Sequence, residues 1–334
     1  MELATTRTRT VMRNLSELIH PTRYTLVIPF EEGLARERET FLKLRESNRA
    51  QARIHLFLSG KAAFHFPSAS MGERRVASVA IAGSGKRARA IAALLNRSGV
   101  AVRTGESGLS EAGLIIDALD DRKAQVTIRH LASQAKPGAV IATTRGRNLD
   151  RLAEMTERHG DIIGLQFRLS SGRSLVEVAP TTRTAPETVH AVLGLIRKTG
   201  VQAVVITQPG LVGQRIIAAC RAAAGDLSRS GVPCRDVKAA LASCGVSRSL
   251  GVSASLRKSL DPALRHHLLG EMAREAAVLV TEGIVRQSFE VDLILVHGYG
   301  LPHDEGGPIW AAGMLRNDGL TVAAYDRSMD KVRA

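Results

Sequence analysis

The sequence predicts an α/β protein in which a Rossmann-like, doubly wound parallel sheet is followed by a helical C-terminal domain. Between residues 76 and 207, short β-branched and apolar runs alternate with helical stretches, which is the pattern of a parallel sheet. After Pro209 and Gly210 the remaining segments show helical periodicity without further strand-helix alternation. We therefore divide the chain into an N-terminal segment at 1–75, a sheet domain at 76–207 and a helical domain at 208–334.

Composition limits the kinds of partner. The 334 residues are 44% hydrophobic, with a mean hydropathy of −0.01, so the chain can bury a core and is long enough for roughly two domains. The net charge of +14 favours an anionic partner, although charge that only serves solubility would give the same sum. Aromatic residues make up 3%, and no nucleic-acid-binding module is recognisable, so nucleic acid is not an expected partner. The apolar runs fall short of the roughly 20 residues that span a membrane.

Cysteine usage predicts neither a metal site nor a disulfide framework. Cys220, Cys234 and Cys244 are odd in number and show no Cys-x-x-Cys spacing. Such thiols fit a reducing cytoplasm. The first residues include Glu2 and Glu17 and lack the apolar core of a secretory signal, which also favours a cytoplasmic location.

The N-terminal segment has a helical pattern. Charged and apolar positions alternate at helical spacing over residues 31–65, which predicts one amphipathic helix packed on a neighbour. Pro67 and Gly72 then interrupt the pattern, so a boundary is expected near residue 75.

A glycine turn follows the first expected strand, at residues 76–81. Gly83 and Gly85 can let the backbone approach a pyrophosphate, and Ala88 follows at the third position of the G-x-G-x-x-A pattern, where a helix opens. Glu106 lies about 20 residues further on, where such folds place the acid that binds a ribose. We interpret this order as a dinucleotide site. The alternatives are a plain strand-to-helix turn, and a Glu106 that only caps a turn.

The remaining elements follow from the same patterns. Further strands are expected where short apolar runs recur, and further helices where apolar residues recur at helical spacing. The expected strands are 100–102, 113–118, 139–142, 162–167, 175–178 and 201–206, and the expected C-terminal helices are 212–223, 237–242 and 264–285.

Taken together, these blocks resemble the 3-hydroxyacyl-CoA dehydrogenase family. AGSGKRARAIA, GLIIDALDD, AKPGAVIATT, SLVEVAP and ITQPGLVGQRI occur in the family's order between residues 76 and 245. Residues 290–313 are similar to the last helical repeat of the multifunctional fatty-acid β-oxidation enzymes, and residues 29–44 to the connector helix that leaves their hydratase domain. The resemblance implies the dehydrogenase part of such an enzyme without the hydratase. That part oxidises the 3-hydroxyl of an acyl-CoA and passes hydride to NAD.

The resemblance also implies four catalytic positions: a histidine base, a glutamate that orients it, and a serine and an asparagine that bind the reacting oxygen. Here the histidine position is Gln166, the asparagine position is Gln214 and the glutamate is Glu177, while the serine falls within 144–147 without a matching hydroxyl. A carboxamide has no basic lone pair near neutral pH, so Gln166 cannot serve as a general base. Strand alternation alone would make Glu177 an ordinary solvent-facing position.

For the cofactor, the resemblance implies NAD bound by Gly83, Gly85, Ala88 and Glu106. The family inserts a helical segment and another strand after this acid, whereas here the next strand follows within a few residues. We therefore expect weak NAD binding. Two hypotheses stay open: a 3-hydroxyacyl-CoA dehydrogenase whose activity is weak or lost, and a non-catalytic relative that binds acyl-CoA or a β-oxidation partner enzyme. A homo-oligomer is compatible with both.

Overall fold

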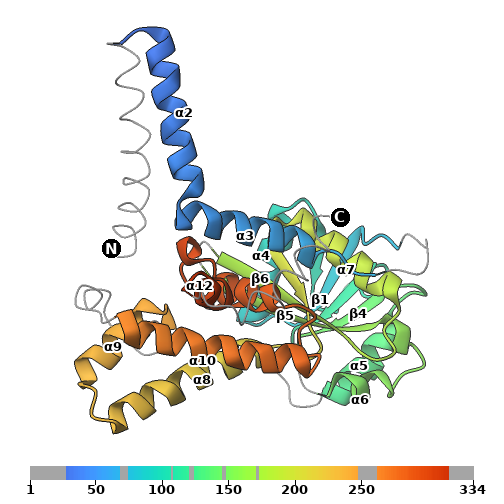
Figure 1. Cartoon of the computed structure of the whole chain (residues 1–334). Coiled ribbons are helices and arrows are strands. Elements are labelled where there is room, and N and C mark those ends of the chain that lie inside the picture. Colours follow the sequence, from blue (N-terminus) through green and yellow to red (C-terminus); the bar gives the residue numbers. More distant parts are fainter. Residues whose placement is uncertain are drawn as a thin grey trace.

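The structure has the predicted architecture, a mostly parallel seven-stranded sheet followed by C-terminal helices (Figure 1). It is a computed structural model. It describes residues 28–67, 74–106, 108–119, 124–144, 148–170, 173–246 and 262–315.

Seven strands form one sheet in the order β2-β1-β3-β4-β5-β6-β7. The chain leaves β1 towards β2 at one edge and returns to β3 on the other side of β1, so the strand order reverses between β1 and β3. Open α/β sheets bind ligands at such a reversal, beyond the carboxyl ends of the strands. The bounds are β1 Ser78–Ala82, β2 Ala101–Thr104, β3 Leu114–Asp117, β4 Val140–Thr143, β5 Ile162–Ser170, β6 Arg173–Pro180 and β7 Gln202–Val205.

The expectation of a parallel sheet is wrong for its last two strands. β6 pairs antiparallel with β5, and β7 pairs parallel with β6, so both run against the first five strands. The reason is the connection: only residues 171 and 172 separate β5 from β6, which is too short for a parallel crossover. β5 also extends past the end of its pairing with β4, at Gly164, and forms a long hairpin with β6.

Helices cover both faces of the sheet, as a doubly wound fold requires. Alternate residues of a strand point to opposite faces, so Ile81 packs in one apolar layer and Ala80 in the other. The first layer is closed by α4 (Lys86–Arg97) and α7 (Pro186–Lys198), and the second by α5 (Ala124–Gln134) and α6 (Leu149–Ala153).

The predicted single helix at 31–65 is two helices. Ser47 adopts an extended conformation (φ −64°, ψ 142°), and its hydroxyl accepts a hydrogen bond from the backbone N–H of Ala50 at 3.2 Å. This N-cap ends one helix and starts the next, because a capping serine favours non-helical dihedral angles. α2 (Phe30–Glu46) extends away from the rest of the molecule, and α3 (Asn48–Ala63) lies across it (Figure 1).

The C-terminal part is helical, and α3 packs into its core. Leu56 of α3 belongs to the same apolar cluster as Leu268 and Leu295. No helix in the described ranges is long and apolar enough to cross a membrane. The elements are α8 Leu211–Arg229, α9 Cys234–Ser243, α10 Pro262–Thr281, α11 Ser288–Leu293, a π-helical turn Ile294–Gly298, a 3-10 turn His303–Glu305 and α12 Pro308–Leu315.

A buried polar cluster fixes α3 to this helical part. His55 Nε2 lies 3.1 Å from Asp292 Oδ2, with both side chains fully buried, and the imidazole stacks on Trp310 at 4.7 Å. Asp292 also accepts the backbone N–H of Ile309 at 2.8 Å, at the start of α12. Burial raises the pKa of Asp292, and the hydrogen bond from His55 opposes that shift. Ser59 Oγ lies 3.4 Å from His55 Nδ1, but this Ser-His-Asp series is closed to solvent and therefore structural.

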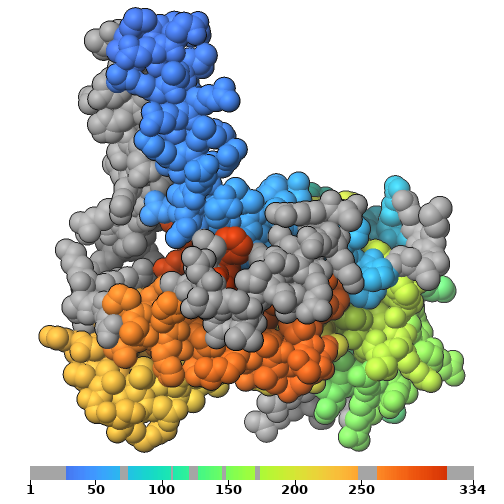
Figure 2. Space-filling view, in the orientation of Figure 1, coloured from blue at the N-terminus to red at the C-terminus, as the bar shows by residue number. Residues whose placement is uncertain are grey.

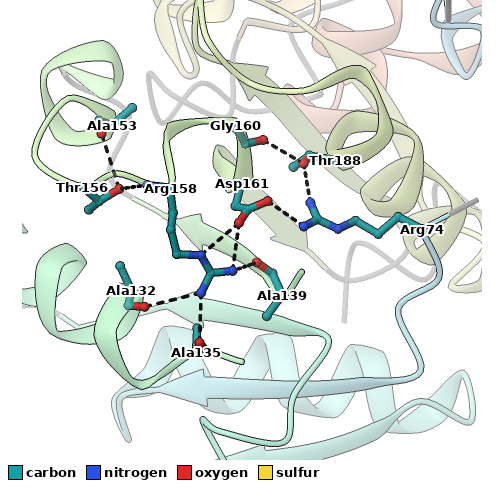
Figure 3. A network of polar contacts seen from close by, with 10 residues as sticks. All are labelled: Arg74, Ala132, Ala135, Ala139, Ala153, Thr156, Arg158, Gly160, Asp161 and Thr188. Carbon is teal, nitrogen blue, oxygen red and sulfur yellow. Dashed lines mark hydrogen bonds and ion pairs between the residues drawn. The ribbon is translucent and has the colours of Figure 1, made fainter. Parts of the chain in front are cut away.

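A second polar network, drawn in Figure 3, lies at the amino ends of β1, β4 and β5. Arg158 binds Asp161 Oδ2 at 2.8 Å and also donates to the carbonyl oxygens of Ala135 and Ala139 at 3.0 and 2.7 Å. Arg74 binds Asp161 Oδ1 at 2.6 Å. These contacts satisfy carbonyls after α5 and tie the approach to β1 to the start of β5, so we assign them to stability.

The thiols differ sharply in their environments, which gives a simple test of the packing. Burial raises the pKa of Cys220 to about 12 and that of Cys244 to about 11, whereas Cys234 is exposed. Because only a thiolate reacts readily, we expect one of the three cysteines to react quickly with a disulfide reagent at mildly alkaline pH, and all three after unfolding. The Cys234→Ser variant should show no fast thiol. Two fast thiols in the native protein would contradict the packing of α8 on α9.

Candidate functional site

The glycine turn lies at the reversal of strand order. Gly83 has φ +127°, and a Cβ there would lie 3.0 Å from the carbonyl oxygen of Ala118, just after β3. A side chain is therefore excluded both by backbone conformation and by space. Gly85 is the N-cap of α4 and forms no side-chain cap, while Ala88 is fully buried against the sheet. The first N–H groups of α4 are thus available to an anion, as in dinucleotide sites.

The first turn of α4 lacks an acidic residue, as do those of α3, α5, α8 and α10. The first turns of α2, α7 and α9 carry acidic residues, which suit the positive end of a helix. The first turn of α4 has no acidic residue and instead carries Lys86 and Arg87, both exposed. This arrangement is unfavourable for the helix alone and favourable for a bound anion.

Glu106 is at the same edge of the sheet but in an open position. It lies two residues beyond β2, which is the edge strand, and its side chain is exposed. Nine residues, 105–113, connect β2 to β3, and those that the structure describes form turns rather than a helix. The described part of this short connection leaves Glu106 exposed.

The hairpin of β5 and β6 brings two of the predicted catalytic positions together. Gln166 lies directly opposite Glu177 in the antiparallel register, so the two side chains share a face. Glu177 is completely buried, whereas strand alternation alone would have left it facing solvent. That expectation is wrong because the turn at 294–298 and the start of α8 cover this face.

Glu177 already has two partners. Its Oε1 accepts a hydrogen bond from Nε of Arg168 at 2.8 Å, and its Oε2 accepts the backbone N–H of Gly210. Gly210 is the N-cap of α8 and has φ +81°, a conformation that suits glycine. The buried carboxylate is therefore neutralised by a guanidinium and held at the positive end of a helix.

Tyr299 closes the other side of Arg168. The guanidinium lies over the phenol ring, 4.3 Å from its centre, and the ring packs so close to α8 that a Cβ at Gly213 would lie 2.0 Å from it. The hydroxyl of Tyr299 is buried without a hydrogen-bond partner in the described structure. Burial raises the pKa of Tyr299; Arg168 opposes the shift, and Glu177 adds to it. The phenol therefore stays protonated, and Arg168 is held between a carboxylate and an aromatic face.

The other predicted positions are not part of this cluster. Gln214 lies in the first turn of α8 with an exposed side chain. Thr144, in the stretch expected to hold the serine, is buried, and its hydroxyl accepts a long hydrogen bond from Arg87 at 3.4 Å. Residues 145–147 lie outside the described ranges. No group of three or more histidine, cysteine or carboxylate side chains that could hold a metal occurs in the described part of the chain.

Sequence reasoning missed Arg168 and Tyr299. Arg168 could have been predicted as a neighbour of Gln166, because it follows Gln166 by two residues in a strand and therefore shares its face. Tyr299 had none, since it follows the site in the chain by more than a hundred residues and reaches it only through the packing of the π-helical turn.

The fold is a Rossmann-type α/β sheet with a helical second part. Residues 104–209 match the family described as 3-hydroxyacyl-CoA dehydrogenase, NAD binding domain. The matched stretch includes Glu106, Gln166 and Glu177, whereas the glycine turn and Gln214 lie outside it.

Two longer proteins are distantly similar in sequence to this chain. The peroxisomal bifunctional enzyme of Cavia porcellus is 26% identical over 243 residues, which cover 57% of this chain and 34% of that protein. The fatty acid oxidation complex subunit alpha of Vibrio cholerae is 30% identical over 147 residues, covering 42% of this chain and 21% of that protein. The chain thus spans about a third or less of the length of these relatives.

Two solved structures align with this chain at low sequence identity. The dehydrogenase part of multifunctional enzyme 1 from C. elegans has a TM-score of 0.49 at 13% identity, covering 76% of this chain and 87% of that one. The 3-hydroxybutyryl-CoA dehydrogenase from Escherichia coli K12 has a TM-score of 0.41 at 18% identity, and the match covers 60% of this chain and 51% of that one.

Proposed function

We propose that this chain is a 3-hydroxyacyl-CoA dehydrogenase-family protein of the fatty-acid β-oxidation type in which oxidation of the 3-hydroxyl is weak or lost. The ion pair between Arg168 and Glu177 carries the proposal. In the family that the sequence resembles, the glutamate orients a histidine base, but here its partner is a guanidinium and the residue opposite is Gln166. A guanidinium stays protonated and an amide is not basic, so neither can accept the hydroxyl proton.

The residues of the glycine turn fit a nicotinamide cofactor in part. Gly83 and Gly85 would let its pyrophosphate approach the start of α4, where Lys86 and Arg87 supply positive charge, and Glu106 would accept hydrogen bonds from a ribose. Bound NAD would supply the hydride acceptor. The open edge beside β2 supports weak rather than tight binding. Such a scaffold would still bind acyl-CoA or a β-oxidation partner enzyme.

Turnover is the direct test. With 3-hydroxybutyryl-CoA and saturating NAD, we expect a rate at least about 10²-fold below the roughly 10 s⁻¹ of a typical enzyme, because general-base catalysis is missing. The rate is measured from the NADH formed. A turnover number of about 1 s⁻¹ or more would show that another group accepts the proton, and the proposal would be wrong.

Cofactor affinity is tested separately by calorimetric titration with NADH. We expect a dissociation constant weaker than about 100 µM, since the turn holds mainly the pyrophosphate and Glu106 is exposed. Gly83→Val should remove the remaining binding, because its side chain would collide with the backbone at Ala118. Gly99→Val is the matched control, since its Cβ would meet nothing within 4 Å and it also has a positive φ. Micromolar affinity in the unchanged protein would contradict the prediction.

A further inference from the structure

Among the described residues, exposed large apolar side chains are concentrated on α2 and α3. Of the six large apolar side chains that are exposed in the described part of the chain, five lie on α2 and α3, and the sixth is Val278. Exposed apolar side chains gathered on neighbouring elements often mark an interaction surface. The five are Phe30, Leu34, Phe41, Ile54 and Phe57.

Three of them form one stripe on α2. Phe30, Leu34 and Phe41 are spaced by four and seven residues, which places them on the same side of a helix with 3.6 residues per turn. They are 79%, 51% and 60% exposed. Figures 1 and 2 show α2 projecting from the sheet and the C-terminal helices.

Two of the charges beside the stripe, Glu31 and Arg45, are complementary to each other in a pair with a second, antiparallel copy. Glu31 lies in the first turn and Arg45 in the last turn. They are 14 residues apart, close to four helical turns, so both flank the stripe on the same side. In a two-fold, antiparallel pair of α2 helices, Glu31 of one copy would face Arg45 of the other, and this contact would occur twice. Leu34 would meet the region of the partner's Phe41.

We propose that α2 is a dimerisation surface that pairs antiparallel with α2 of a second copy of this chain. The geometry also sets a limit on affinity. Arg38 lies midway between Glu31 and Arg45 on the same flank. At the two-fold axis it would therefore face Arg38 of the second copy. Like charges at that point weaken the contact. The dimer is therefore expected to be weak, with a dissociation constant on the order of 10 to 100 µM for so short an interface.

Sedimentation of the full chain over a range of concentrations at low ionic strength tests the proposal. Glu31→Arg and Arg45→Glu should each weaken the dimer about tenfold or more, because each single reversal creates two like-charge contacts. The double variant Glu31→Arg/Arg45→Glu should return to within about threefold of the original, because the swapped charges again attract. Arg38→Leu should tighten the dimer, and Phe41→Ser should abolish it.

Three results would overturn the proposal. One is a protein that stays monomeric at every concentration, which would leave the stripe to a different partner. Another is a dimer whose strength none of the α2 substitutions changes, which would place the interface elsewhere. The third is a double charge reversal that is no stronger than the single reversals, which would exclude the antiparallel pairing.

Discussion

Replacing Gln166 with histidine and Arg168 with methionine together should raise dehydrogenase turnover by about 10²-fold or more, whereas Gln166→His alone should change it less than about tenfold. The single change supplies an imidazole but leaves Glu177 paired with Arg168 at 2.8 Å. The nearby guanidinium would also favour the neutral over the protonated imidazole and so weaken it as a base. Removing the arginine frees the carboxylate to orient the histidine and to stabilise its charged form.

The comparison is made on rates at saturating NAD, so that weak cofactor binding does not obscure the chemical step. Arg168→Met alone is the matched control, and it should remain inactive because no base is present. A full increase from Gln166→His alone would show that Arg168 does not occupy the glutamate. No increase in the double variant would show that the loss of activity has another cause, such as glutamine in place of asparagine at position 214.

Much of the sheet could be predicted from the sequence because its strands are buried on both faces. The apolar runs that became β1, β3 and β4 need only local pattern to be recognised. The reversal of β6 was missed because apolar alternation does not encode direction; the two-residue connection before Arg173 does. The break at Ser47 was missed for a similar reason, since a single capping serine does not disturb the apolar periodicity on either side.

The site was predicted less completely than the fold, and the difference is physical. The glycine turn is local, so Gly83 and Gly85 could be identified from spacing alone. The surroundings of Glu177 are not local, because they are set by Gly210 at the start of α8 and by the π-helical turn that precedes Tyr299. Contacts of this kind depend on tertiary packing, so they cannot be predicted from the sequence near Glu177.

The Arg168–Glu177 pair should also be important for stability. Arg168→Met should lower the free energy of unfolding by about 3 kcal/mol, because it leaves the carboxylate of a fully buried glutamate without its cation. The side chain of Arg168 is 22% exposed, so water partly compensates, and we expect the lower end of the range for broken buried pairs. Arg274→Met is the matched control. Arg274 pairs with Glu271 at 2.6 Å but is 67% exposed, so its loss should cost less than about 1 kcal/mol.

The double variant Arg168→Met/Glu177→Met decides whether charge is the cause. Removing both charges also removes the unpaired carboxylate, so the double variant should be more stable than Arg168→Met alone, although it has one more substitution. Unfolding in urea, followed by circular dichroism, gives the free energies. If Arg168→Met and Arg274→Met cost the same, or if the double variant is the least stable of the three, the guanidinium does not neutralise Glu177. Glu177 would then be available to orient a base.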